Sequence, residues 1–80
     1  MTDLDHAISS LEHLCAIHAR ACDTLNYART QAELQGWRDV RDGVPRSEGE
    51  RNFHHADLRA RYAQARYDAQ ALLQPTKEEP

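Results

Sequence analysis

Large apolar residues are scarce in this chain: Leu, Ile, Val and Phe together supply only 13 of its 80 residues. A content this low makes it hard for a chain to build a hydrophobic core by itself. A domain of this size also buries only roughly 60% of its unfolded surface even when it is well packed. We therefore expect the missing burial to come from self-association or from docking on a partner.

Intrinsic disorder is the alternative interpretation of low hydrophobicity. The formal net charge is only -3, however, and the apolar residues recur with a helical period. These two features favour a folded helical oligomer over a disordered chain.

Long apolar runs, a targeting segment and pairable cysteines are missing as well. No stretch of 18 apolar residues occurs, and the acidic start over residues 1–5 does not match a signal peptide, so neither a membrane span nor secretion is predicted. Cys15 and Cys22 lie on one predicted helix about 10 Å apart, too far to bridge each other. A reduced, cytoplasmic setting is therefore predicted. Nine Arg against one Lys, with twelve Ala, indicate a GC-rich bacterial or phage gene.

What the chain does contain is two Ala-rich helical patterns, separated once between Gly36 and Gly49. The first predicted helix spans about 3–35, and a 3.5-residue repeat typical of a helical bundle runs along it. The repeat consists of Leu4, Ile8, Leu11, Cys15, His18, Cys22 and Leu25. Gly36 is interpreted as the C-terminal cap of this helix, and residues 36–46 as the turn that follows it.

The second predicted helix spans about 47–74, with Ser47 and Glu50 as a capping box at its start and Pro75 after its end. Residues 1–74 then form a single all-α domain, an antiparallel two-helix hairpin that pairs into a homodimeric four-helix bundle. Residues 75–80 are expected to be a disordered tail. If the hairpin folds symmetrically about residues 41 and 42, Ala65 faces His18, Tyr62 faces Cys22 and Leu72 faces Leu11.

Cys15, His18 and Cys22 have the spacing of a metal-binding set on one helical face, and thiolates with imidazole are suitable ligands for zinc or for Cu(I). Three ligands leave a fourth to be found, and no Cys or His is predicted opposite them. We therefore predict that they are packing residues and that the chain carries no metal or cofactor. No nucleophile with a base, phosphate loop or paired-carboxylate pocket is recognisable in the sequence, so no enzymatic activity is predicted.

Arginines gather around Trp37 and along one stripe of the second helix, and Trp and Arg are the residues that most often anchor protein interfaces. The predicted partner-binding residues are Trp37, Arg38, Arg41, Arg46, Arg51, His55, Arg59 and Arg66. Two alternatives stay open: the arginines pair with nearby acids such as Asp39, Asp42, Glu48 and Glu50, and the indole packs over the hairpin end on Leu34 and Phe53.

The predicted function is that of a small, non-enzymatic interaction protein, phage-encoded or regulatory, that inhibits or adapts a larger bacterial protein. One alternative is a helical oligomer that binds a nucleotide or another phosphate through its arginines. The other is a metal-binding bundle that uses Cys15, His18 and Cys22. Nucleic-acid binding is not predicted, because an acidic chain without a basic patch gains little from counterion release.

Overall fold

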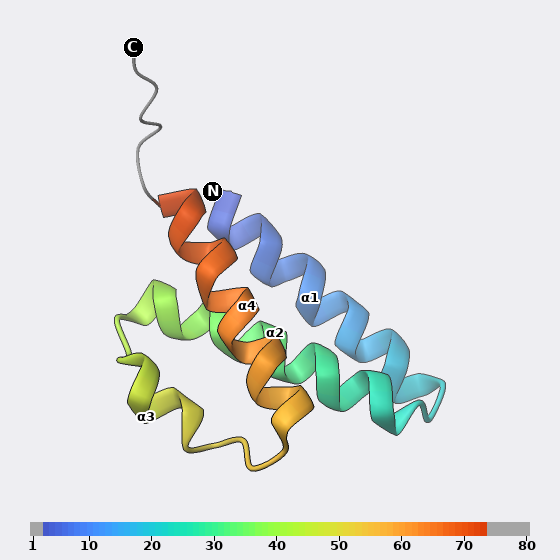
Figure 1. Ribbon diagram of the computed structural model, residues 1–80. Coiled ribbons are helices and arrows are strands. Elements are labelled where there is room, and N and C mark those ends of the chain that lie inside the picture. The colour runs from blue at the N-terminus through green and yellow to red at the C-terminus, as the bar shows by residue number, and fades with distance from the viewer. Residues whose placement is uncertain (1–2, 74–80) are drawn as a thin grey trace.

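The computed structural model describes residues 3–73, and these residues form four helices and no strand. The helices are α1 (Asp3–Arg20), α2 (Thr24–Asp42), α3 (Arg46–Glu50) and α4 (Ala56–Leu73) (Figure 1). The all-α prediction is confirmed, although two of the three breaks between the helices, at 21–23 and 51–55, were not predicted. None of these four helices is both long enough and apolar enough to cross a bilayer. The predicted tail at 75–80 lies outside the described residues.

The single helix predicted over 3–35 is wrong, because the chain turns at residues 21–23. Cys22 adopts a left-handed backbone with φ of 58°, which no helix interior contains. Asp23 then caps α2: its carboxylate accepts hydrogen bonds from the backbone N–H of Asn26 and, at 2.7 Å, from the Asn26 amide. An Asp at this position satisfies one of the unpaired N–H groups at the helix start, so a capping signal interrupts an apolar repeat that looks continuous.

The turn predicted at 36–46 begins too early. Gly36 and Trp37 lie inside α2, which continues to Asp42 and ends at Gly43 with φ of 77°. The Val44 N–H donates to the Asp39 carbonyl at 2.8 Å, the bond that closes a helix with a left-handed glycine. Gly36 has a different role: a Cβ there would lie 2.7 Å from the Tyr62 carbonyl oxygen, so glycine allows α4 to approach α2 closely.

The single helix predicted over 47–74 is also wrong, because residues 51–55 separate α3 from α4. The N-cap of α3 is Pro45, which provides no side-chain hydrogen bond, so the capping box of Ser47 and Glu50 does not mark the helix start. Phe53 leaves the helical path and packs its ring on Tyr62, with 5.3 Å between the ring centroids. A long-range aromatic contact thus competes with helix continuation at this point.

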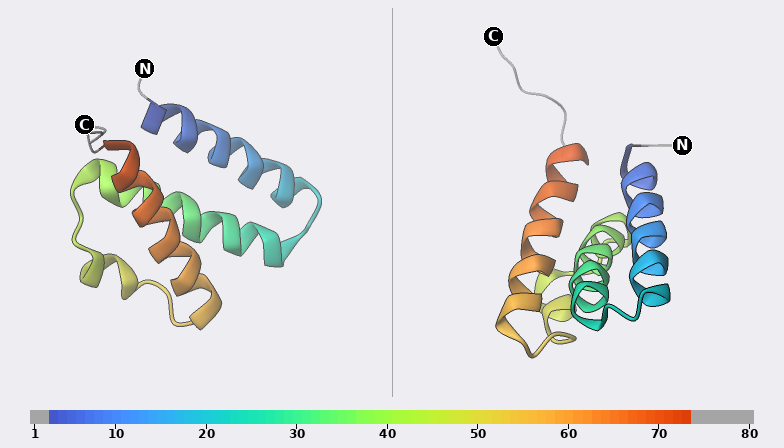
Figure 2. Two further views of the ribbon diagram at one scale, coloured as in Figure 1. Left: turned by 45° about the horizontal axis from the view of Figure 1, so that its top comes forward. Right: turned by 90° about the vertical axis from the view of Figure 1, so that its right-hand side faces the viewer.

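The central helix of the molecule is α2, with α1 packed along one side of it and α4 across the other (Figure 2). Two ion pairs, Arg29–Asp57 and Glu33–Arg61, join residues that are 28 positions apart, so α2 and α4 run in the same direction. The symmetric pairing expected from the sequence is therefore wrong. Ala65 and Tyr62 face Gly36 and Gly49 instead of His18 and Cys22.

A small apolar core joins α1 and α2 and includes one residue of α4. Its buried members are Leu4, Ile8, Cys15, Leu34 and Ala69, with Leu11, Trp37 and Val40 partly buried against them. The first half of the repeat predicted on α1 does form this seam. The second half does not, because Leu25 follows the turn and is exposed.

Candidate functional site

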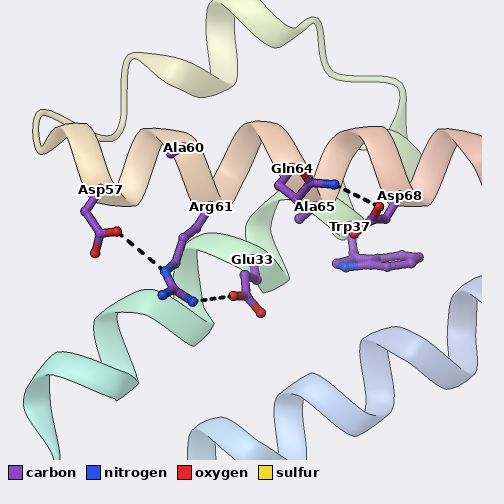
Figure 3. A pocket seen from close by; sticks show the side chains of 8 residues that line it. All are labelled: Glu33, Trp37, Asp57, Ala60, Arg61, Gln64, Ala65 and Asp68. Carbon is purple, nitrogen blue, oxygen red and sulfur yellow. Dashed lines mark hydrogen bonds and ion pairs between the residues drawn. The ribbon is translucent and has the colours of Figure 1, made fainter.

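An open groove of about 470 Å³ lies along α2 and α4 (Figure 3). It is lined by Glu33 and Trp37 of α2 and by Asp57, Ala60, Arg61, Gln64, Ala65 and Asp68 of α4. The volume lies within the range of ordinary ligand sites, roughly 300–1,000 Å³. We refer to this cavity as the α2–α4 groove.

Trp37 forms one end of the α2–α4 groove. Its side chain is half-buried, packs against the apolar core and also lines the cavity. In Figure 3 the indole lies flat beside Ala65 and Asp68, between the ribbons of α4 and α1. The core contacts fix the ring, and its remaining surface is available at the groove. A rigid, partly exposed Trp is a frequent anchor of protein interfaces.

A charged chain of Asp57, Arg61 and Glu33 forms the other end of the groove. Arg61 Nη1 donates to Glu33 Oε2 at 3.0 Å, and Arg61 Nε lies 3.7 Å from Asp57 Oδ1. This Nε is buried and makes no hydrogen bond. The hydrogen bond from Arg29 is the main cause that lowers the pKa of Asp57, so this carboxylate stays charged at neutral pH.

The groove is lined by three carboxylates, those of Glu33, Asp57 and Asp68, and by the guanidinium of Arg61. Arg29 lies outside the lining but pairs with Asp57 at 2.9 Å, so these five groups together carry one negative charge. Asp68 accepts a hydrogen bond from the neutral amide of Gln64 at 3.1 Å, which leaves its charge in place. Such a lining repels phosphate and other anions and attracts cations.

Helix α1 adds an exposed apolar side chain, Leu14, on the same side of the molecule. Glu12 binds Arg38 at 2.7 Å on one flank of the contact between α1 and α2. Leu14 comes two residues later, about 200° further around the helix, and so lies on the opposite flank. Leu14 is 38% exposed and Ile17, one turn further along, is 44% exposed. The flank with Leu14 is the one on the Trp37 side of α2.

The opposite face of α4 is closed by α3 and contains a buried polar network around Tyr62, which is 0% exposed. The Tyr62 hydroxyl donates to Asp39 Oδ2 at 2.6 Å and accepts from Arg66 Nη1 at 3.1 Å. Gln35 donates to the second Asp39 oxygen at 2.7 Å, and Arg66 also donates to the Val44 carbonyl at 2.8 Å. Burial, followed by the hydrogen bond to Asp39, raises the pKa of Tyr62.

Glycine at position 49 makes this closure possible. Gly49 is buried in α3, and a Cβ on it would overlap the Tyr62 hydroxyl and lie 2.6 Å from Asp39 Oδ2. The Tyr62 network therefore offers no opening to a ligand and serves to hold α2, α3 and α4 together.

The structure does not bring the predicted partner-binding residues together. Trp37 lies at the groove, whereas Arg66 is buried and bonded within the Tyr62 network. The surface arginines have intramolecular partners: Arg38 binds Glu12, Arg41 binds Asp42, Arg46 binds Glu50, and Arg59 donates to the Phe53 carbonyl. Arg51 and His55 are exposed in the segment between α3 and α4. The alternative in which arginines pair with nearby acids thus holds for Arg41 and Arg46.

The structure also separates the candidate metal ligands. Cys15 is buried in the core, His18 lies in the last turn of α1, and Cys22 is exposed in the turn beyond the helix. Burial raises the pKa of the Cys15 thiol, which disfavours the thiolate that a metal would need. Among residues 3–73 no group of three or more His, Cys, Asp or Glu side chains is placed to hold a metal ion.

Four charged residues of the groove were not identified from the sequence: Glu33, Asp57, Arg61 and Asp68. Their spacing carried a usable signal, since Asp57, Arg61, Gln64 and Asp68 follow one another at steps of four, three and four along one face of α4. The contribution of Glu33 and Trp37 from α2 required the packing of the two helices to be known.

A comparison of the chain with protein-family models, curated proteins and solved structures finds no match.

Proposed function

We propose that this protein is a non-enzymatic helical interaction protein and that it contacts its partner through the α2–α4 groove. The observation that supports this most directly is the position of Trp37, which is held by the core on one side and lines an open cavity on the other. Anchors of this kind, ringed by polar groups, are typical of protein interfaces. An inhibitor or adaptor of a larger bacterial protein is the function that fits such a surface.

Of the partner-binding residues predicted from the sequence, Trp37 alone lines the α2–α4 groove. The predicted arginines lie outside this surface. Arg38, Arg41 and Arg46 form exposed ion pairs, which contribute little to binding unless a partner offers them better geometry. A phosphate or nucleotide is not favoured by the groove, because three carboxylates face it.

The test is to fill the groove and ask whether a partner is lost. Ala60 is exposed and lines the groove, whereas Ala71 is exposed on the same helix and does not line it. Proteins captured from a bacterial lysate by the unmodified chain should be lost with Ala60→Trp and retained with Ala71→Trp, as mass spectrometry would show. Equal capture by both variants would rule out the groove as the partner surface.

We also propose that the chain forms a homodimer in the cytoplasm. The support is the number of large apolar side chains left exposed on a single copy, of which Tyr67 at 70% is the most exposed. The other exposed ones are Leu14, Ile17, Leu25, Tyr27, Leu72 and Leu73. Light scattering at micromolar concentration tests this directly, and a mass of one chain would refute it. The exposed Cys22 thiol is consistent with a reducing compartment.

A further inference from the structure

We infer that the occupant of the α2–α4 groove is an amphipathic helix of a partner protein with Lys or Arg along one flank, an inference that rests on the proposed interaction function. Three observations lead to it: the length of the groove, its apolar lining residues and the charge of its rim.

The groove has the length of a short helix. Its wall on α4 extends from Asp57 to Asp68, which corresponds to about 16 Å at 1.5 Å per residue. Three helical turns of a partner lie along such a wall. A peptide that binds by strand addition would need an unpaired strand edge, and the described residues of this chain form no strand that could offer one.

The apolar surface of the groove comes from Trp37 and Ala60, because the third apolar lining residue, Ala65, is 3% exposed. The exposed Leu14 lies on the flank of α1 that borders the Trp37 side of α2. In Figure 2 α2 lies between α1 and α4, so a partner helix placed along the groove would be a fourth long helix beside them. Binding of an amphipathic helix in a groove uses apolar contacts of this kind.

The charge of the rim selects the kind of helix. Arg61 pairs with Glu33 and Arg29 pairs with Asp57, so the charge left over at the groove is that of Asp68, whose partner is the neutral amide of Gln64. A helix with a basic flank places a positive charge against Asp68, whereas an acidic helix would add repulsion. A second copy of this chain is a poorer occupant, because the chain itself carries a net charge of -3.

Trp37 makes the inference directly measurable, since it is the only tryptophan in the chain. The probes are two designed 14-residue amphipathic peptides without aromatic residues, identical in their Leu stripe and differing only in Lys or Glu on the flanks. The Lys peptide should shift the Trp37 fluorescence and bind at least tenfold more tightly than the Glu peptide. Its affinity should fall as salt is raised, because screening weakens charge pairs at a solvent-exposed rim.

A matched pair of charge reversals locates the effect. Asp68→Lys and Glu48→Lys change the net charge equally, and both residues are exposed, but Glu48 lies on α3 away from the groove. Asp68→Lys should weaken the Lys peptide at least tenfold, and Glu48→Lys should leave its affinity within twofold. Equal effects of the two reversals, or equal binding of the two peptides, would overturn the inference.

Ala60→Trp separates this inference from the proposed function. If Ala60→Trp abolishes partner capture while the Lys and Glu peptides bind alike, the groove is the partner surface but the basic helix is wrong. If Ala60→Trp leaves partner capture intact, the proposed function itself fails. If Ala60→Trp converts a dimer into a monomer in light scattering, the occupant is a second copy of the chain, and the partner helix is again wrong.

Discussion

The two faces of α4 differ in how their charges are satisfied. On the closed face, Tyr62 links the carboxylate of Asp39 to the guanidinium of Arg66, and these two charged residues are 4% and 8% exposed. On the open face, Arg61 lies between Glu33 and Asp57 with a buried Nε that makes no hydrogen bond. On each face an arginine of α4 lies near a carboxylate of α2, yet only one face is covered by another element of the described chain.

The difference comes from α3. This five-residue helix brings Gly49 against the Tyr62 hydroxyl, and among residues 3–73 no helix covers α4 in the same way on the side of Arg61. Buried polar groups cost free energy unless they are hydrogen-bonded, so the covered face requires the complete Tyr62 network. On the open face the side chains of Arg61 and Glu33 remain 39% and 33% exposed, so water reaches much of their polar surface, and the buried Arg61 Nε is the exception. We therefore expect stability to depend on the closed face and recognition to depend on the open one.

The largest effect is expected from Tyr62→Ala, compared with Tyr67→Ala on the same helix. Tyr62 is 0% exposed and Tyr67 is 70% exposed. Loss of the buried ring should lower the free energy of unfolding by about 3–5 kcal/mol, which approaches the whole stability of a small domain. Loss of the exposed ring should change it by less than about 0.5 kcal/mol. Urea unfolding followed by circular dichroism measures both, and similar losses for the two variants would contradict the distinction between the faces.

The next largest effect is expected from Gly36→Ala, which separates α2 from α4. The added Cβ would lie 2.8 Å from the Ala65 Cβ as well as against the Tyr62 carbonyl, and both of these atoms are held in a helix. Overpacking of this kind costs about 1–3 kcal/mol, more than the roughly 1 kcal/mol that Ala gains over Gly in a helix interior. A lower melting temperature is therefore expected. An unchanged or higher one would show that the helices are not in close contact there.

Tyr62→Phe isolates the hydroxyl within the closed face. It leaves Asp39 and Arg66 without their shared partner, at an expected cost of about 1–3 kcal/mol near neutral pH. The raised pKa of Tyr62 also predicts a pH dependence. The folded chain holds the phenol proton more tightly than the unfolded chain, so this stability is present below pH about 10 and is lost as pH rises further.

Other groups that titrate at alkaline pH also change the free energy of unfolding. They are present in both Tyr62→Phe and the unmodified chain, so the difference between the two proteins isolates the Tyr62 hydroxyl. Burial also raises the pKa of Cys15, so part of the loss of stability above pH about 9 belongs to that thiol. The difference in unfolding free energy between the two proteins should narrow above pH about 10. A constant difference across that range would show that the hydroxyl does not titrate as a buried group.

The smallest effect is expected from Glu33→Gln on the open face. Its ion pair with Arg61, with 3.0 Å between Nη1 and Oε2, joins side chains that are each about one third exposed. Pairs of this type contribute about 0–1 kcal/mol, so the melting temperature should hardly change. Binding of the Lys peptide should nevertheless weaken. A large loss of stability would mean that the Glu33–Arg61 pair holds the fold together. Stability would then depend on both faces of α4, contrary to the distinction drawn between them.

Local sequence signals predicted the class of fold and part of the core. The apolar repeat correctly predicted a helical seam from Leu4 to Cys15, and Trp37, predicted to bind a partner, lies at the groove. The same repeat continued into Cys22 and Leu25, where the Asp23 cap and the left-handed Cys22 end the helix. Periodicity alone could not reveal that break, because Ala and Leu on both sides of it favour helix equally well.

The roles of the three glycines could not be predicted from the sequence. Gly36, Gly43 and Gly49 look alike in the sequence, yet one permits a close helix contact, one caps a helix and one covers a buried hydroxyl. The sequence by itself determined that this chain is helical, poor in core residues and acidic, because composition and period depend on neighbours along the chain. Only the tertiary structure decided which face of α4 is sealed and which is open, because that depends on contacts between residues such as Gly49 and Tyr62, whose separation in sequence carries no periodic signal.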